Sequence, residues 1–120
     1  MPKEAKIFLV EDNEGYRKVL ARFLTMEGHV VFSQAGSLEE ALNMITRLLA
    51  KDVDILLTDG NLSELSSDGI DGASIAKKFR KKFPNKPVLS ISLDRQTWSD
   101  DQSISKKSGP IAIAKRVTTL

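Results

Sequence analysis

Short runs of mainly apolar residues recur along this chain, and they constrain its fold more than any other feature. Each run has at most five residues, a length typical of a strand and too short for a helix of several turns. Strands that are apolar throughout are covered on both faces, which is typical of parallel sheets. The predicted strands are residues 6–10, 30–32, 54–58, 88–92 and 111–114.

The segments between these runs carry apolar residues at helical spacing. Asp12 or Asn13 can cap a first helix, which Gly28 ends. Ser37 and Glu40 form the capping box of a second helix. Strands that alternate with helices predict an α/β fold, and right-handed crossovers leave few topologies. We therefore expect a flavodoxin-like, doubly wound, five-stranded parallel sheet of order 2-1-3-4-5.

Composition excludes several classes of protein. The chain has 120 residues, enough for one domain, and no cysteine, so disulfides and thiolate metal sites are excluded. No apolar stretch approaches the roughly 20 residues that span a bilayer. The net charge is +2, and the one aromatic residue among the basic residues at 77–82, Phe79, belongs to the apolar face of the predicted helix. We interpret them as a solvated helix face, and we expect a cytoplasmic domain that binds neither nucleic acid nor membrane.

Acidic residues follow two of the predicted strands. Glu11 and Asp12 come directly after the first strand, and Asp59 follows the third. In a sheet of this order, ligands bind beyond the carboxyl ends of the strands, beside the switch point between strands 1 and 3. Carboxylates that converge there repel each other, and a divalent ion with oxygen ligands relieves this repulsion. The pattern predicts a Mg²⁺ site that also receives a phosphoryl group.

The other predicted strand ends carry groups suited to phosphoryl transfer. An aspartate at a strand tip, such as Asp59, can act as a nucleophile and form an aspartyl phosphate. Such a transfer needs mainly positioning and neutralisation of charge. Ser92, at the end of the fourth predicted strand, offers a hydroxyl, and Lys115, after the fifth, offers a cation.

With these residues in place, the sequence resembles the receiver domain of response regulators, the phosphoacceptor of two-component signalling. The resemblance implies that Asp59 takes a phosphoryl group from a histidine kinase or phosphotransfer protein, with self-phosphorylation from small donors and self-dephosphorylation. It also implies a switching surface for a partner, such as an output domain or a second copy. The resembling segments are "IFLVEDNEGYRKVL", "DILLTDGNL", "DGASIAKKF", "KPVLSIS" and "GPIAIAKR".

The resemblance also assigns a role to each residue of the predicted site. Mg²⁺ would be held by the acids of the first and third strand ends and by one backbone carbonyl. The implied metal ligands are Glu11, Asp12, Asp59 and the carbonyl of Asn61, the switch hydroxyl is Ser92, and the lysine that pairs with the phosphoryl group is Lys115.

The sequence departs from the family pattern in several places. The loop 60–71 is longer than the usual turn, and Leu93 replaces a small residue after the switch hydroxyl. Ala112 stands where receivers often carry an aromatic residue, three positions before Lys115. The chain ends five residues after Lys115, so we expect one receiver domain over residues 1–120 whose closing helix is missing or truncated.

Three alternatives stay open at this point. A pseudo-receiver that is not phosphorylated would act as a protein–protein adaptor. A Mg²⁺-dependent phosphatase with an aspartyl nucleophile would need a second aspartate where this chain has Asn61. A flavin carrier of the same topology would need hydroxyls and glycines after the first strand, where "EDNEG" instead repels a phosphate.

Overall fold

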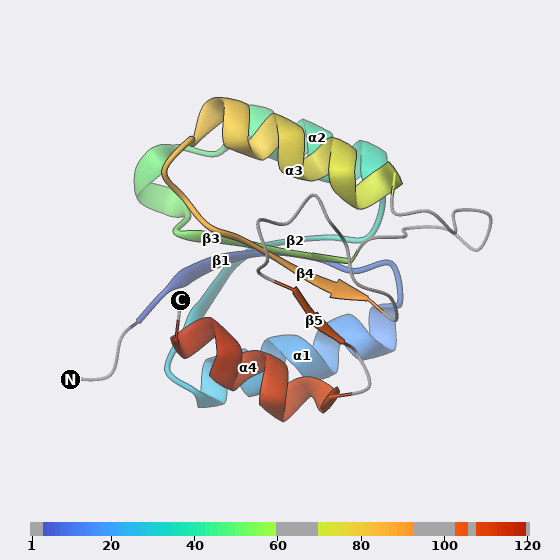
Figure 1. Cartoon of the computed structure of the whole chain (residues 1–120), viewed down its shortest axis with the longest axis vertical. Coiled ribbons are helices and arrows are strands. Elements are labelled where there is room, and N and C mark those ends of the chain that lie inside the picture. The colour runs from blue at the N-terminus through green and yellow to red at the C-terminus, as the bar shows by residue number, and fades with distance from the viewer. Residues whose placement is uncertain (1–3, 60–69, 93–102, 106–107, 120) are drawn as a thin grey trace.

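Five parallel strands form one sheet, with helices on both of its faces (Figure 1). The computed structural model describes residues 4–59, 70–92, 103–105 and 108–119. The strands lie in the order β2-β1-β3-β4-β5. Their bounds are β1 Lys6–Val10, β2 Val30–Ala35, β3 Ile55–Asp59, β4 Val88–Ser92 and β5 Ser103–Ser105. The helices are α1 Glu14–Met26, α2 Leu38–Arg47, α3 Ile70–Lys82 and α4 Gly109–Thr118, with a 3-10 turn η1 at Ala50–Asp52.

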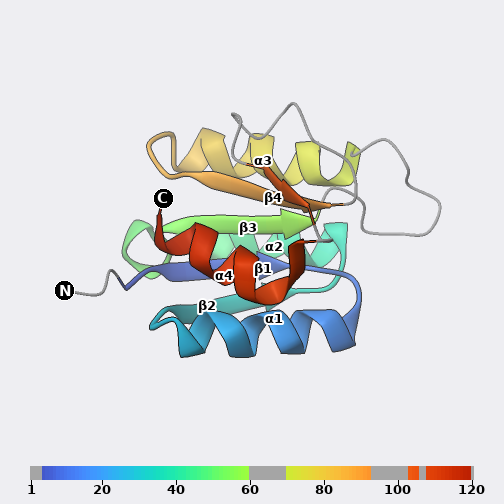
Figure 2. The ribbon, with the colours of Figure 1, turned by 60° about the horizontal axis from the view of Figure 1, so that its bottom comes forward.

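Two hydrophobic layers enclose the sheet. The first lies between the sheet and helices α2 and α3, and the second between the sheet and helices α1 and α4 (Figures 1 and 2). Alternate residues of β1 and β3 point into opposite layers, as the pleat of a strand requires. Phe8 and Leu56 belong to the first layer, and Ile7 and Leu57 to the second, all fully buried. The middle residues of these two strands are therefore apolar on both sides, because both faces of the sheet are covered here.

The helices begin where the sequence predicts their caps. Oδ1 of Asn13 accepts a hydrogen bond from the Tyr16 amide at 2.8 Å, and Oγ of Ser37 accepts one from the Glu40 amide at 3.2 Å. Of the two residues offered as the cap of α1, Asn13 takes that role. Gly28, with φ of 92°, follows α1 in a backbone conformation that favours glycine. No helix within the described ranges is both long and apolar enough to cross a bilayer.

The edge strand β2 is longer than predicted, and it contains an irregularity. Val31 pairs with Ile7, whereas the next pair joins Ser33 to Phe8, so Phe32 is an extra residue in β2. Val31 and Ser33 therefore lie toward opposite layers, and Phe32 is half exposed. Because the next positions of this edge strand are partly or fully exposed and carry polar residues, the apolar run in the sequence stops at residue 32, and the predicted strand stopped there as well.

The last part of the chain corrects two predictions. The four long strands and their order agree with the expected sheet, but residues 111–114 are not a strand. They lie inside α4, and the outer strand β5 is the three-residue segment Ser103–Ser105. The prediction of a missing or truncated closing helix is also wrong. Helix α4 buries Ile113, Ala114 and Val117 against the second layer, beside α1.

The direction of α4 decides which edge of the sheet its last residues reach. Near its end, Oγ1 of Thr118 lies 2.9 Å from Nε2 of His29, just before β2. Nδ1 of the same ring accepts a hydrogen bond from the Ala5 amide, just before β1, at 3.1 Å. Helix α4 therefore ends at the amino edge of the sheet, opposite the edge at which the strands finish.

Candidate functional site

Three carboxylates meet at the carboxyl edge of the sheet, beside the switch point. Glu11 and Asp12 follow β1, and Asp59 is the last residue of β3. One carboxylate oxygen of each lies within 4.8 Å of the others. Glu11 and Asp59 are buried, at 0% and 4% exposure, and Asp12 is exposed. We call Glu11, Asp12 and Asp59 the acidic cluster.

The sheet positions these acids through its register. Val10 pairs with Thr58, so the residues that follow on the two strands leave the sheet side by side. The Glu11 amide donates a 3.0 Å hydrogen bond to the Ala35 carbonyl at the end of β2, which extends the β1–β2 pairing by one residue. Thr58 is buried and its hydroxyl donates to the Asp59 carbonyl at 3.0 Å.

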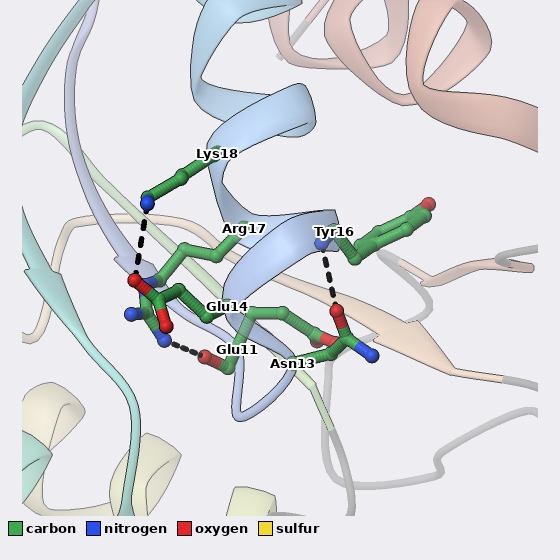
Figure 3. A network of polar contacts seen from close by, with 6 residues as sticks. All are labelled: Glu11, Asn13, Glu14, Tyr16, Arg17 and Lys18. Carbon is green, nitrogen blue, oxygen red and sulfur yellow. Dashed lines mark hydrogen bonds and ion pairs between the residues drawn. The ribbon is translucent and has the colours of Figure 1, made fainter.

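The first turn of α1 contributes a polar network beside the cluster (Figure 3). Glu14 and Lys18 form an exposed ion pair at 3.0 Å, one helical turn apart. The hydrogen bond and the charge of Lys18, with the charge of Arg17, lower the pKa of the Glu14 carboxyl. Glu14 therefore stays ionised on the solvent side of the helix. Arg17 instead points toward the backbone of Glu11.

The cluster has the chemistry of a magnesium site. All three groups are carboxylates, which are ligands that Mg²⁺ prefers, and two of them are held in buried positions. Ligand oxygens on opposite sides of one Mg²⁺ lie roughly 4 Å apart, because each Mg–O distance is about 2.0–2.1 Å. The spacing in the cluster suits a single ion. The exposure of Asp12 leaves a side open to water or to a phosphate oxygen.

The other predicted site residues have different outcomes. Ser92 is the last residue of β4, and Asp59 pairs with the residue before it, Ile91. The strand thus brings the Ser92 backbone to the same edge, while the position of its hydroxyl stays a prediction. Asn61, like Leu93 and most of the 60–71 loop, lies outside the described residues, so its carbonyl also stays a prediction.

Lys115 is not at this edge, so the strand end on which its predicted role rested is absent. It lies on an exposed position in the second half of α4, the half that leads toward the amino edge of the sheet. The error follows from taking 111–114 as a strand. Ala112 also lies in α4, so it does not occupy the aromatic position of the last strand. With β5 at Ser103–Ser105, the residue that directly follows the last strand is Lys106.

Comparison with known proteins agrees with this fold. The family of response regulator receiver domains matches residues 7–117, and the chain therefore belongs to that family. It is 29% identical over 91 residues to a chemotaxis protein CheY homolog of Campylobacter jejuni, covering 74% of this chain and 65% of that protein. It is 32% identical over 90 residues to the transcriptional regulatory protein GlrR of Escherichia coli, covering 74% of this chain and 18% of GlrR.

Solved structures show the same architecture. The receiver domain of the hybrid histidine kinase CckA has a TM-score of 0.74 at 28% identity, over 95% of this chain and 96% of that one. CheY of Borrelia burgdorferi, solved with CheX, BeF3 and Mg²⁺, has a TM-score of 0.79 over 96% of this chain and 87% of that one. At 20% identity, the second likeness shows the fold alone. The chain spans less than two thirds of the curated relatives' length.

Proposed function

We propose that this receiver domain is a phosphoacceptor, with Asp59 as the residue that takes the phosphoryl group. The observation that carries the proposal is the acidic cluster, in which three carboxylate oxygens lie within 4.8 Å of one another at the carboxyl edge of the sheet. Carboxylates are rarely buried in a protein, and here two of three neighbouring carboxylates are buried. A site that binds a cation and a phosphoryl group together explains this arrangement.

In the proposed reaction, a carboxylate oxygen of Asp59 attacks the phosphorus of a phosphohistidine or of a small acyl phosphate. An O–P bond forms to Asp59, and the bond from phosphorus to the donor breaks, with its electron pair leaving on the donor. Glu11, Asp12, Asp59 and the carbonyl of Asn61 would hold Mg²⁺. The ion, when bound, neutralises charge on the transferred phosphoryl oxygens.

The remaining roles come from the strands beside β3. Ser92, the last residue of β4, would offer its hydroxyl to the phosphorylated aspartate. Lys106 would take the pairing role first predicted for Lys115, because it comes directly after β5 in the sequence, although it lies outside the described residues. The donor would be a cytoplasmic histidine kinase or phosphotransfer protein. An output domain or a second copy would read the switched surface.

A simple labelling experiment tests this proposal. The chain is incubated with Mg²⁺ and acetyl phosphate, and its intact mass is measured. We expect the mass of one added phosphoryl group in the parent and no addition in Asp59→Asn. Asp54→Asn is a matched control, since Asp54 precedes the same strand at its opposite end and should leave labelling unchanged. No added mass in the parent, or equal labelling of Asp59→Asn, would exclude the phosphoacceptor role.

A pseudo-receiver that acts as an adaptor is the second candidate. Strand β5 favours it, because its sequence Ser-Ile-Ser contains no aromatic residue that could respond to phosphorylation. The long loop predicted at residues 60–71, which in the structure gives way to α3 at Ile70, is the other departure in its favour. This candidate predicts partner binding that acetyl phosphate and Asp59→Asn leave unchanged, so the labelling experiment separates the two.

A further inference from the structure

Arg17 reaches back from α1 to the loop that carries the acidic cluster. Its Nη1 donates a partly buried, 2.6 Å hydrogen bond to the backbone carbonyl of Glu11 (Figure 3). The Arg17 amide donates to the Asn13 carbonyl at 2.8 Å, so its backbone is fixed in the first turn of α1. The side chain thus joins a rigid helix to the peptide that links Glu11 and Asp12.

The backbone of Glu11 is consequently held from two sides. Its amide donates to the Ala35 carbonyl at 3.0 Å, and its carbonyl accepts from Arg17. The Glu11 carbonyl belongs to the peptide plane between Glu11 and Asp12. Its orientation therefore sets the directions in which both acidic side chains leave the backbone.

Gly36, next to Ala35, leaves the room that the Arg17 guanidinium occupies. A Cβ at Gly36 would lie 2.8 Å from Nη1 of Arg17, closer than such atoms approach. Among the described glycines only Gly28 and Gly109 have a positive φ, so the space beside Gly36, and not its backbone conformation, accounts for a glycine at this position. The atom that would be displaced is the end of a flexible side chain. Gly36→Ala should therefore move the guanidinium with little effect on the fold.

We propose that Arg17 is a positioning residue for the acidic cluster, and that Gly36 is its required neighbour. Arg17 fixes the peptide between Glu11 and Asp12, so that both carboxylates face Asp59. The part of this inference that concerns Mg²⁺ rests on the proposed function. The positive charge of Arg17 by itself opposes binding of a cation, so any benefit to the metal must come from geometry.

Calorimetric titration with Mg²⁺ tests the proposal, because loss of positioning and loss of the positive charge at Arg17 should change the magnesium affinity in opposite directions. We expect Arg17→Met and Gly36→Ala each to weaken Mg²⁺ binding by about tenfold, as loss of groups that orient metal ligands commonly does. Removal of charge alone would strengthen binding. Arg22→Met is the matched control, because Arg22 is an exposed arginine of the same helix. Equal or tighter binding in Arg17→Met than in Arg22→Met would overturn the proposal.

A second measurement needs no metal. In the metal-free protein, NMR should show changed carbonyl-carbon and amide-nitrogen shifts for the peptide between Glu11 and Asp12 in Arg17→Met and Gly36→Ala. Arg22→Met should leave those shifts unchanged. Unaltered shifts in Arg17→Met would refute the positioning role. If the parent binds no Mg²⁺, the proposed metal site fails, while these spectra still decide whether Arg17 positions the peptide.

Discussion

His29 and Thr118 hydrogen-bond at 2.9 Å and so join the start of β2 to the last turn of α4. His29 is 3% exposed, and Nδ1 of its ring accepts a hydrogen bond from the Ala5 amide at 3.1 Å. Nδ1 therefore carries no proton, and Nε2 donates to the Thr118 hydroxyl. The neutral form of His29 is the one that fits between the sheet and α4.

This contact predicts that stability depends on pH. Burial lowers the pKa of His29 below its ordinary value of 6.5, while the charges of Glu27 and Glu4 act weakly in the opposite direction. The unfolded chain then binds the proton more readily, so the free energy of unfolding falls as pH drops below about 6.5 toward the folded pKa. His29→Gln should lose this dependence. Urea unfolding of both proteins between about pH 5.5 and 7.5 measures it, and parallel pH profiles would contradict the prediction.

The helical state of residues 109–118 gives a matched pair of substitutions. In a strand, Ile111 and Ile113 would share one face, whereas in α4 Ile113 is fully buried and Ile111 is 52% exposed. We expect Ile113→Ala to lower the free energy of unfolding by about 2–4 kcal/mol and Ile111→Ala by less than about 0.5 kcal/mol. Denaturant unfolding measures both. Similar losses would favour the strand.

Magnesium should stabilise the folded domain through the acidic cluster. An ion that binds only the folded state at ten times its Kd adds about 1.4 kcal/mol to the free energy of unfolding. Asp12→Asn should remove most of this increment, because it takes away the exposed ligand of the three. Thermal unfolding with and without Mg²⁺ measures the effect. Equal increments in the parent and the variant would place the ion elsewhere.

Two lysines should differ in their effect on phosphorylation. Lys106→Ala removes the cation that follows β5 and should slow labelling by acetyl phosphate at least tenfold, or abolish switching of the partner surface. Lys115→Ala removes an exposed charge on α4 and should label at the parent's rate. The rate of mass change measures labelling. The reverse ranking would restore the role first predicted for Lys115.

The sequence sufficed for the centre of the sheet and for the acids at its edge. Strands β1 and β3 are apolar on both faces, so their runs were unambiguous, and Asp12 and Asp59 could be placed from the strand ends and the order of the strands. What the sequence could not supply was the direction of each side chain. The link from Arg17 to the Glu11 carbonyl depends on how α1 and β2 pack, which no local pattern encodes.

The error at the end of the chain has a physical cause. A short apolar run such as Ile-Ala-Ile-Ala fits a buried strand or part of a helix equally well. Gly109 and Pro110 directly before it were the signal for a helix start, since proline is well tolerated in the first turn. Strand β5 was missed because Ile104 is its single apolar residue.

The extra residue at Phe32 has a consequence for how this domain meets other chains. β2 is the outer strand of the sheet, and Val30 and Phe32 are both largely exposed along it. A flat strand with such residues would invite a foreign strand to pair with it and begin a fibre. The irregularity interrupts the even spacing of peptide groups halfway along β2, so an incoming strand finds no continuous ladder to join. The domain can thus expose apolar side chains along its edge strand without aggregating edge to edge with other copies.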